Sequence, residues 1–266
     1  LTVNAVNDAP VLDQISDISF DEDTVGILTI SANDVDGDQI EYSIVGGNSI
    51  TTSIIDNIIN FTPSQDFNGS EAFTIIISDG FLQDSQAFIV TFNNVNDNPI
   101  AFDQNLEINE DQEVVIILSG TDIDNDALSY SIENNPSYGT LELNGNIVIY
   151  TPNLNESGVI DSFIYNVSDG ELSDNGLINI TINSINDAPI IEVISDQQID
   201  EDTQLSYQLV AYDYDELDDI TFSVYSSSTS LTSWIVDNTL NLLPNPNWFG
   251  TATITVTVSD GLLSST

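Results

Sequence analysis

The sequence repeats itself three times with a period of about 90 residues, and this constrains the fold more than any other feature. Asn7-Asp8-Ala9-Pro10 recurs as Asn96-Asp97-Asn98-Pro99 and as Asn186-Asp187-Ala188-Pro189. Four further markers follow in the same order in every repeat. In the first repeat they are Asp21-Glu22-Asp23-Thr24, Asp34-Val35-Asp36-Gly37-Asp38, Pro63 with Gly69, and Ser78-Asp79-Gly80. In the second repeat they are Asn109-Glu110-Asp111-Gln112, Asp122-Ile123-Asp124-Asn125-Asp126, Pro152 with Gly158, and Ser168-Asp169-Gly170. In the third repeat they are Asp200-Glu201-Asp202-Thr203, Asp213-Tyr214-Asp215-Glu216, Pro244 with Gly250, and Ser259-Asp260-Gly261.

The markers also predict the domain organisation. A length of 266 residues would by itself suggest about two domains, whereas five markers in one order predict three. We expect residues 1–6 to be the tail of a preceding repeat, followed by repeats at 7–95, 96–185 and 186–266. The third repeat is expected to lack its last strand, so the sequence is interpreted as a segment of a longer array.

Within each repeat, apolar and polar residues alternate with a period of two, which is typical of half-buried strands. Turn dipeptides such as Asp36-Gly37, Gly46-Gly47 and Asp79-Gly80 separate these runs. The strands predicted in the first repeat are 18–20, 27–30, 40–44, 53–55, 58–61, 73–77 and 88–92. About seven short strands in some 90 residues indicate an all-β fold of tandem immunoglobulin-like, antiparallel Greek-key sandwiches in a linear array.

The composition restricts the possible partners. The chain has 44 Asp and Glu residues but no Lys, Arg or His, which gives a formal net charge of −44. Binding to nucleic acid or to an anionic membrane surface is excluded, because both need basic residues. With no cysteine, the chain has neither disulfides nor a thiol nucleophile. Cations that balance its carboxylates must therefore come from solution, and this favours metal binding.

The acidic markers fall at strand ends and at the repeat boundaries. Carboxylates on loops at one end of a sandwich can converge on a point, which carboxylates along a strand cannot do. Ca²⁺ takes six to eight oxygen ligands from Asp, Glu, Asn and backbone carbonyls. An Asp-x-Asp loop, an Asn-Asp-x-Pro linker and an Asp-Gly turn together offer such a set. The markers thus predict calcium sites at the junctions.

At this point the motif order resembles that of a known family. Glu22, Ala32-x-Asp34-x-Asp36, Tyr42-Ser43-Ile44, Ser78-Asp79-Gly80 and Asn96-Asp97-Asn98-Pro99 are similar in type and order to the motifs of a cadherin repeat. The similarity is closer still to the cadherin-like tandem repeats of large bacterial surface proteins and adhesins, and it covers essentially the whole chain. In that family Ca²⁺ lies between successive repeats. The resemblance implies an extracellular, calcium-rigidified stalk or fibre segment of a cell-surface adhesin that functions in cell adhesion.

The same resemblance implies the ligands at each junction. At the first complete junction they are Glu22, Asn96, Asp97, Asn98, Asp122, Asp124 and Asp169. At the second they are Glu110, Asn186, Asp187, Asp213, Asp215 and Asp260, while an upstream half-site comprises Asn7, Asp8, Asp34, Asp36 and Asp79. Glu201 would serve a further repeat. Two features depart from the family pattern: Asn94 and Ser184 replace a linker acid, and only Glu71 and Asp161 are weak candidates for its Asp-x-Glu motif. We therefore expect one to three ions per junction.

Several alternatives stay open. Asp, Asn and Gly are common turn residues, so any single Asp-Gly is more simply a turn than a ligand. A recognition module would bind a sugar or protein through its end loops or through Trp234, which has no aromatic counterpart in the other repeats. A filament subunit would complete the last repeat with a strand from another copy. Paired carboxylates can hydrolyse glycosides, but acids that recur in every repeat indicate a scaffold, so we expect no enzyme.

Overall fold

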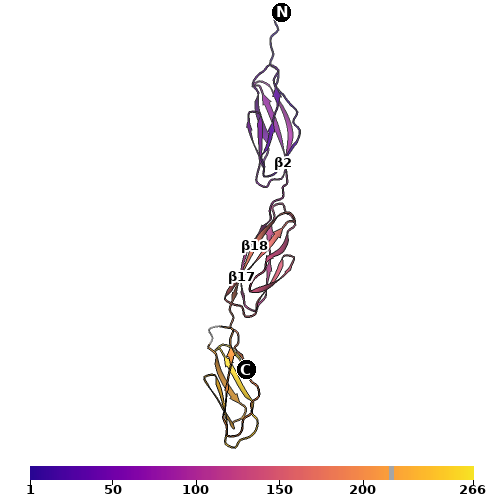
Figure 1. Ribbon diagram of the computed structural model, residues 1–266. Coiled ribbons are helices and arrows are strands. Elements are labelled where there is room, and N and C mark those ends of the chain that lie inside the picture. The colour runs from indigo at the N-terminus through magenta and orange to yellow at the C-terminus, as the bar shows by residue number, and fades with distance from the viewer. Residues whose placement is uncertain (216–218) are drawn as a thin grey trace. The chain divides into compact units, whose positions relative to one another are not determined.

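The computed structural model describes residues 1–215 and 219–266 (Figure 1). Glu216, which ends the third Asp-x-Asp marker, lies outside the described residues. Every regular element in the described part of the chain is a β-strand, so the all-β prediction is confirmed. No described segment is a helix of the length and hydrophobicity needed to cross a membrane.

The strands are numbered β1 to β26 along the chain. In the first repeat they are β1 (Val11–Leu12), β2 (Ile18–Asp21), β3 (Gly26–Thr29), β4 (Ala32–Asn33), β5 (Glu41–Gly46), β6 (Ile50–Ile55), β7 (Ile58–Pro63), β8 (Gly69–Ser78) and β9 (Gln83–Asn93). In the second they are β10 (Ile100–Ala101), β11 (Gln104–Asn109), β12 (Val114–Ile117), β13 (Gly120–Thr121), β14 (Ser129–Asn134), β15 (Gly139–Asn144), β16 (Ile147–Pro152), β17 (Val159–Ser168) and β18 (Ser173–Asn183). In the third they are β19 (Ile190–Ile191), β20 (Leu205–Gln208), β21 (Ala211–Tyr212), β22 (Thr221–Ser226), β23 (Leu231–Val236), β24 (Thr239–Pro244), β25 (Ile254–Ser259) and β26 (Ser264–Ser265).

The first repeat forms two sheets that enclose one core. Their strand orders are β2-β9-β8-β5 and β3-β7-β6. All seven predicted strands are present, and the short β1–β4 pair is an addition that the alternation of residues did not predict. β2 runs parallel to β9, with Ile18 opposite Val90, because the chain returns at the end of the repeat to lie beside the segment that opened it.

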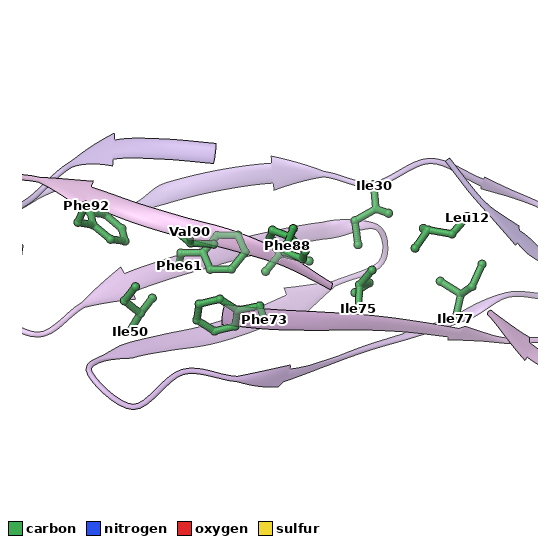
Figure 2. Close-up of a cluster of buried hydrophobic side chains, with 11 residues drawn as sticks. Leu12, Ile30, Ile50, Phe61, Phe73, Ile75, Ile77, Phe88, Val90 and Phe92 are labelled. Carbon is green, nitrogen blue, oxygen red and sulfur yellow. The ribbon is translucent and has the colours of Figure 1, made fainter. Parts of the chain in front are cut away.

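Apolar side chains from both sheets meet between them (Figure 2). Phe61 of β7 packs edge-on against Phe73 of β8, with ring centroids 5.3 Å apart, and against Phe88 of β9 at 6.1 Å. Each fully buried side chain of this size stabilises the fold by about 1.5–3 kcal/mol. Burial alternates along β8, where Phe73, Ile75 and Ile77 are all buried, as the period of two predicts.

The second repeat has the same strand orders, β11-β18-β17-β14 and β12-β16-β15, and β11 is parallel to β18. The third differs at one edge. Its sheets are β20-β24-β23 and β22-β25-β26, and residues 194–200, which correspond to β2 and β11, form no strand. In the first two repeats that segment pairs with β9 or β18, so its extended hydrogen bonding depends on this parallel partner.

The two tryptophans lie in the third repeat. Trp248 packs against the buried cluster of Leu209, Leu240 and Leu242. Trp234 is half-buried on β23, opposite Asn241 of β24. It therefore does not present a fully exposed aromatic face for binding.

By the density of contacts, the chain divides into two compact units whose limits cut through the second repeat. The first comprises Leu1–Ala101, Ser119–Tyr130 and Asn166–Asn175, and the second comprises Phe102–Leu118, Ser131–Tyr165 and Gly176–Thr266. The Asp-x-Asp loop and the Asp-Gly turn of the second repeat thus belong to the same unit as the whole first repeat. All residues of the first junction lie in the first unit, and all those of the second junction lie in the second.

Candidate metal centres at the repeat junctions

A two-stranded pair brings each linker beside its Asp-x-Asp loop. β1 begins directly after Pro10 and pairs with β4, which ends at Asn33, immediately before Asp34. The pairs β10–β13 and β19–β21 repeat this arrangement in the second and third repeats. Short backbone pairing, rather than packing of the sandwich, therefore positions the Asn-Asp linker against the acidic loop.

Within each Asp-x-Asp loop, the first carboxylate uses one oxygen to hold the turn. The backbone N–H of Asp36 donates to Oδ1 of Asp34 at 2.8 Å. The equivalent bonds are 2.9 Å from Asp124 to Asp122 and 3.1 Å from Asp215 to Asp213. The other oxygen, Oδ2, of Asp34, Asp122 and Asp213 is buried with no hydrogen-bond partner among the described residues.

The second carboxylate of the loop binds the linker backbone. Oδ2 of Asp124 accepts the N–H of Asp97 at 2.8 Å, and Oδ2 of Asp215 accepts that of Asp187 at 2.7 Å. In the upstream half-site, Oδ2 of Asp36 accepts the N–H of Asp8, also at 2.8 Å. The side chains of Asp97 and Asp187 then have a buried Oδ2 with no partner.

The Asn of each linker donates to the late Asp of the repeat that follows it. Nδ2 of Asn96 lies 2.9 Å from Oδ2 of Asp169, and the same bond joins Asn186 to Asp260 at 2.9 Å and Asn7 to Asp79 at 2.8 Å. The other oxygen, Oδ1, of Asp169 accepts the N–H groups of Glu171 and Leu172 in the Asp-Gly turn. The N–H of Leu172, followed by the Asn96 amide, lowers the pKa of Asp169, because both donors favour its ionised form.

The glutamate of the preceding repeat reaches the linker from the other side. Glu22 is only 2% exposed; its Oε1 accepts the N–H of Val95 at 2.7 Å, and its Oε2 has no partner. Glu110 is 5% exposed and its Oε1 accepts the N–H of Ile185 at 2.8 Å. Glu201 is exposed. Glu22 and Glu110 each follow a strand that pairs with the last strand of the repeat, whereas the segment before Glu201 forms no strand.

The structure therefore brings together most of the residues that the sequence singled out. The side chain of Asn98 is exposed, as are those of Asp8 and Asp36. Sequence reasoning missed Asp23 and Asp66, whose carboxylates share a cluster with Asp97 in which one oxygen of each lies within 4.8 Å of the others. It also missed Asp38 and Asp126 as members of acidic triads with the two acids of their Asp-x-Asp loops. Asp38 and Asp126 were visible in the repeated marker, whereas Asp66 has no acidic counterpart in the other repeats.

Glu71 and Asp161, the weak candidates for an Asp-x-Glu motif, have a different role. Glu71 accepts three backbone N–H bonds, at 2.8–3.1 Å, from residues 48–50. Asp161 is 2% exposed and accepts the N–H groups of Ser137 and Tyr138 and the hydroxyl of Tyr150. Both acids therefore hold the loop before a hairpin in place, and backbone or hydroxyl donors occupy the oxygens that a metal would need.

The electrostatic surroundings of the linker acids, Asp97 and Asp187, differ from those of Glu71 and Asp161, whose oxygens accept hydrogen bonds. Burial, followed by the charges of Asp23 and Asp66, raises the pKa of Asp97. Burial, followed by the charge of Glu110, likewise raises the pKa of Asp187. Each linker Asp thus lies among carboxylates that repel it, and in a chain without Lys or Arg no side chain of its own can offset that charge.

The donor set fits a hard divalent cation. Ca²⁺ is bound by oxygens at about 2.3–2.6 Å, so oxygens on opposite sides of one ion lie up to about 5 Å apart. The triads Asp34, Asp36 and Asp38, and Asp122, Asp124 and Asp126, each offer three oxygens within 4.8 Å of one another. Such a set of carboxylate oxygens suits Ca²⁺ rather than a softer metal.

Comparison with solved structures found several likenesses at low identity. Human protocadherin-24 EC1-2 in form II is 18% identical, over 65% of this chain and 97% of that chain, with a TM-score of 0.46. A variant of titin domains I67–I69 is 11% identical, over 96% of this chain and 95% of that chain, with a TM-score of 0.33. An endo-fucoidan hydrolase of glycoside hydrolase family 107 is 17% identical over 98% of this chain, with a TM-score of 0.33. The chain spans 43% of that hydrolase's length.

Comparison with curated proteins found no match. The sequence model described as the bacterial Ig domain matches three times, at residues 7–91, 96–181 and 186–266. These matches cover most of the chain and follow the period of its repeats. The chain belongs to the bacterial Ig domain family, as three tandem copies of that domain.

Proposed function

We propose that the chain is a calcium-rigidified segment of an extracellular stalk or fibre in a cell-surface adhesin. One observation carries this proposal. Six carboxylate oxygens, on Glu22, Asp34, Asp97, Asp122, Asp187 and Asp213, are buried without a hydrogen-bond partner among the described residues. A buried, unpaired carboxylate is costly. Asp34, Asp122 and Asp213 are equivalent positions of the three repeats, and Asp97 and Asp187 are equivalent positions of two linkers, which supports a cation as their common partner.

The mechanism is electrostatic. Without metal, the carboxylates of Asp97 and Asp122 repel their neighbours, and the linker gains freedom when they move apart. With Ca²⁺, the same oxygens coordinate one or more ions and restrain the linker. Extracellular modules of this kind bind Ca²⁺ with a Kd of about 10⁻⁴–10⁻³ M, so the junctions would fill outside a cell.

The ligand assignments, the domain limits at 95/96 and 185/186, and the extracellular location are parts of the same proposal. The partners it requires are neighbouring repeats of the same chain. The acids recur in every repeat, and repeated acids serve a scaffold better than an active site. We therefore propose no enzymatic role.

Small-angle scattering of the full chain tests the proposal. We expect a larger maximum dimension and a narrower distribution of conformations in excess calcium than in chelator. The double variant Asp122→Asn/Asp213→Asn should lose most of this response, whereas Glu107→Gln, at an exposed position of β11, should keep it. Identical scattering of the wild type in calcium and in chelator would refute the proposal.

The two alternatives are weaker. A sugar-binding or protein-binding module through Trp234 has little support, because that side chain is half-buried on β23. Filaments formed by strand complementation between copies would appear as concentration-dependent assembly. No specific contact among residues 1–215 and 219–266 favours either of them over the calcium-dependent stalk.

A further inference from the structure

The two complete junctions differ in one acidic side chain, although the φ angle at that position is the same. Asp23 and Asp111 occupy equivalent turns with φ angles of 62° and 60°, and Asp66 and Asn155 occupy equivalent loops, both at 55°. Asp and Asn both tolerate this left-handed region. At this pair of positions the junctions therefore differ in the side chain, Asp66 or Asn155, and not in the φ angle.

That side chain changes what surrounds the linker acid. In the first repeat, Asp66 contributes a third carboxylate to the cluster with Asp23 and Asp97, with one oxygen of each within 4.8 Å of the others. In the second repeat, an amide replaces it, and the backbone N–H of Asn155 donates to Oδ1 of Asp111 at 2.9 Å. The third repeat repeats the second arrangement, with Asn247 donating to Asp202 at 2.9 Å.

A second observation, independent of the cluster, indicates a ligand at the first junction. Glu22, next to Asp23 in the chain, is 2% exposed, and its Oε2 is buried with no partner among the described residues. Its charge acts on Asp97 together with those of Asp23 and Asp66. At the second junction, Oε1 of Glu110 accepts the N–H of Ile185 at 2.8 Å, and its Oε2 is not among the buried oxygens left without a partner in the described part of the chain.

We propose that Asp23, Asp66 and Asp97, with Glu22, hold an additional Ca²⁺ at the first junction, and that the second junction lacks this site. The inference rests on the proposed function, since it presupposes that the junctions bind calcium. Its consequence is unequal loading: the first junction binds more calcium than the second, so as calcium falls the two linkers are released at different concentrations.

The test counts ions bound to the full chain by equilibrium dialysis against Ca²⁺ after removal of metal by chelator. Asp66→Asn gives the first junction the chemistry of the second at a φ angle that Asn accepts. We expect this variant to bind one ion fewer than the wild type. Asp23→Asn should lose the same ion, and it provides a second measurement if one variant folds poorly. Asp56→Asn is the matched control, because Asp56 also has a φ of 55° but lies exposed in the turn between β6 and β7.

The outcomes separate this inference from the proposed function. One ion lost in Asp66→Asn and in Asp23→Asn, with no loss in Asp56→Asn, supports the additional site. If the wild type binds calcium and both junction variants bind the same number of ions, the inference is overturned while the proposed function stands. Absence of calcium binding by the wild type would overturn both.

Discussion

The acids that hold the hairpin loops and the acids at the junctions differ in how their buried charge is compensated. Asp161 receives two backbone N–H groups of the loop and the Tyr150 hydroxyl at 2.7–3.0 Å. Asp122 is also partly buried, yet one of its oxygens has no donor among the described residues. The carboxylate of Asp161 is therefore compensated by donors of its own repeat. The orphaned oxygen of Asp122 would instead need a cation from solution.

This difference follows from the composition of the chain. Without Lys or Arg, a carboxylate can be compensated only by backbone N–H groups, hydroxyls, amides or a cation from solution. Hairpin loops supply N–H donors at low cost, because their amides are not engaged in a sheet. The comparison predicts that removing a hairpin acid destabilises its repeat regardless of calcium, whereas removing a junction acid matters only when calcium is present.

The largest effect is expected for Asp161→Asn. The amide replaces an acceptor-only group that is fully surrounded by donors, so the second repeat should lose about 3 kcal/mol of unfolding free energy. Hydrogen exchange at the amides of β15 and β16 measures the loss. It should be equal in calcium and in chelator, and Glu142→Gln, at an exposed position of β15, should show none. A loss that vanished in chelator would place Asp161 among the metal ligands.

For Asp122→Asn, in contrast, we expect the loss of stability to depend on calcium. At a hundredfold excess of free Ca²⁺ over Kd, one bound ion stabilises the protein by about 2.7 kcal/mol, and the variant should lose most of that gain. In chelator it should be at least as stable as the wild type, because an unpaired buried charge has been removed. Calorimetric unfolding in both conditions measures the two values. Equal destabilisation with and without calcium would contradict the comparison.

Some of these residues could be predicted from the sequence and some could not. The repeat identified Asp34, Asp122 and Asp213 because equivalent residues recur in order, and the period of two located the strands that carry them. Asp66 escaped because the other repeats have Asn there, so no repetition marked it. The role of Asp161 escaped for another reason: only the folded hairpin shows that the N–H groups of residues 137–138 point at its carboxylate.

A smaller effect is expected for Glu71→Gln in the first repeat. Glu71 accepts three backbone N–H bonds from residues 48–50 but is less buried than Asp161. The substitution should cost about 1–2 kcal/mol, measured by hydrogen exchange at β6 and β7, and calcium should not change the cost. Glu41→Gln, at an exposed position of β5, is the control. Protection that depended on calcium at this hairpin would link it to the junction instead.

The smallest effect is expected for the pH dependence of the stability lost in Glu71→Gln. Burial opposes ionisation of Glu71, but the N–H groups of Ser49, Asn48 and Ile50 outweigh it and lower its pKa. A carboxyl whose pKa is lower in the folded state stabilises fully above the pKa of the unfolded chain, and the stability is lost as pH falls through the folded value. The stability difference between wild type and Glu71→Gln should therefore be full above the ordinary pKa of a Glu side chain and shrink as pH falls below it. Comparing the two chains cancels the titration of the other acids, so a constant difference as pH falls would mean that the hairpin bonds do not favour the ionised form of Glu71.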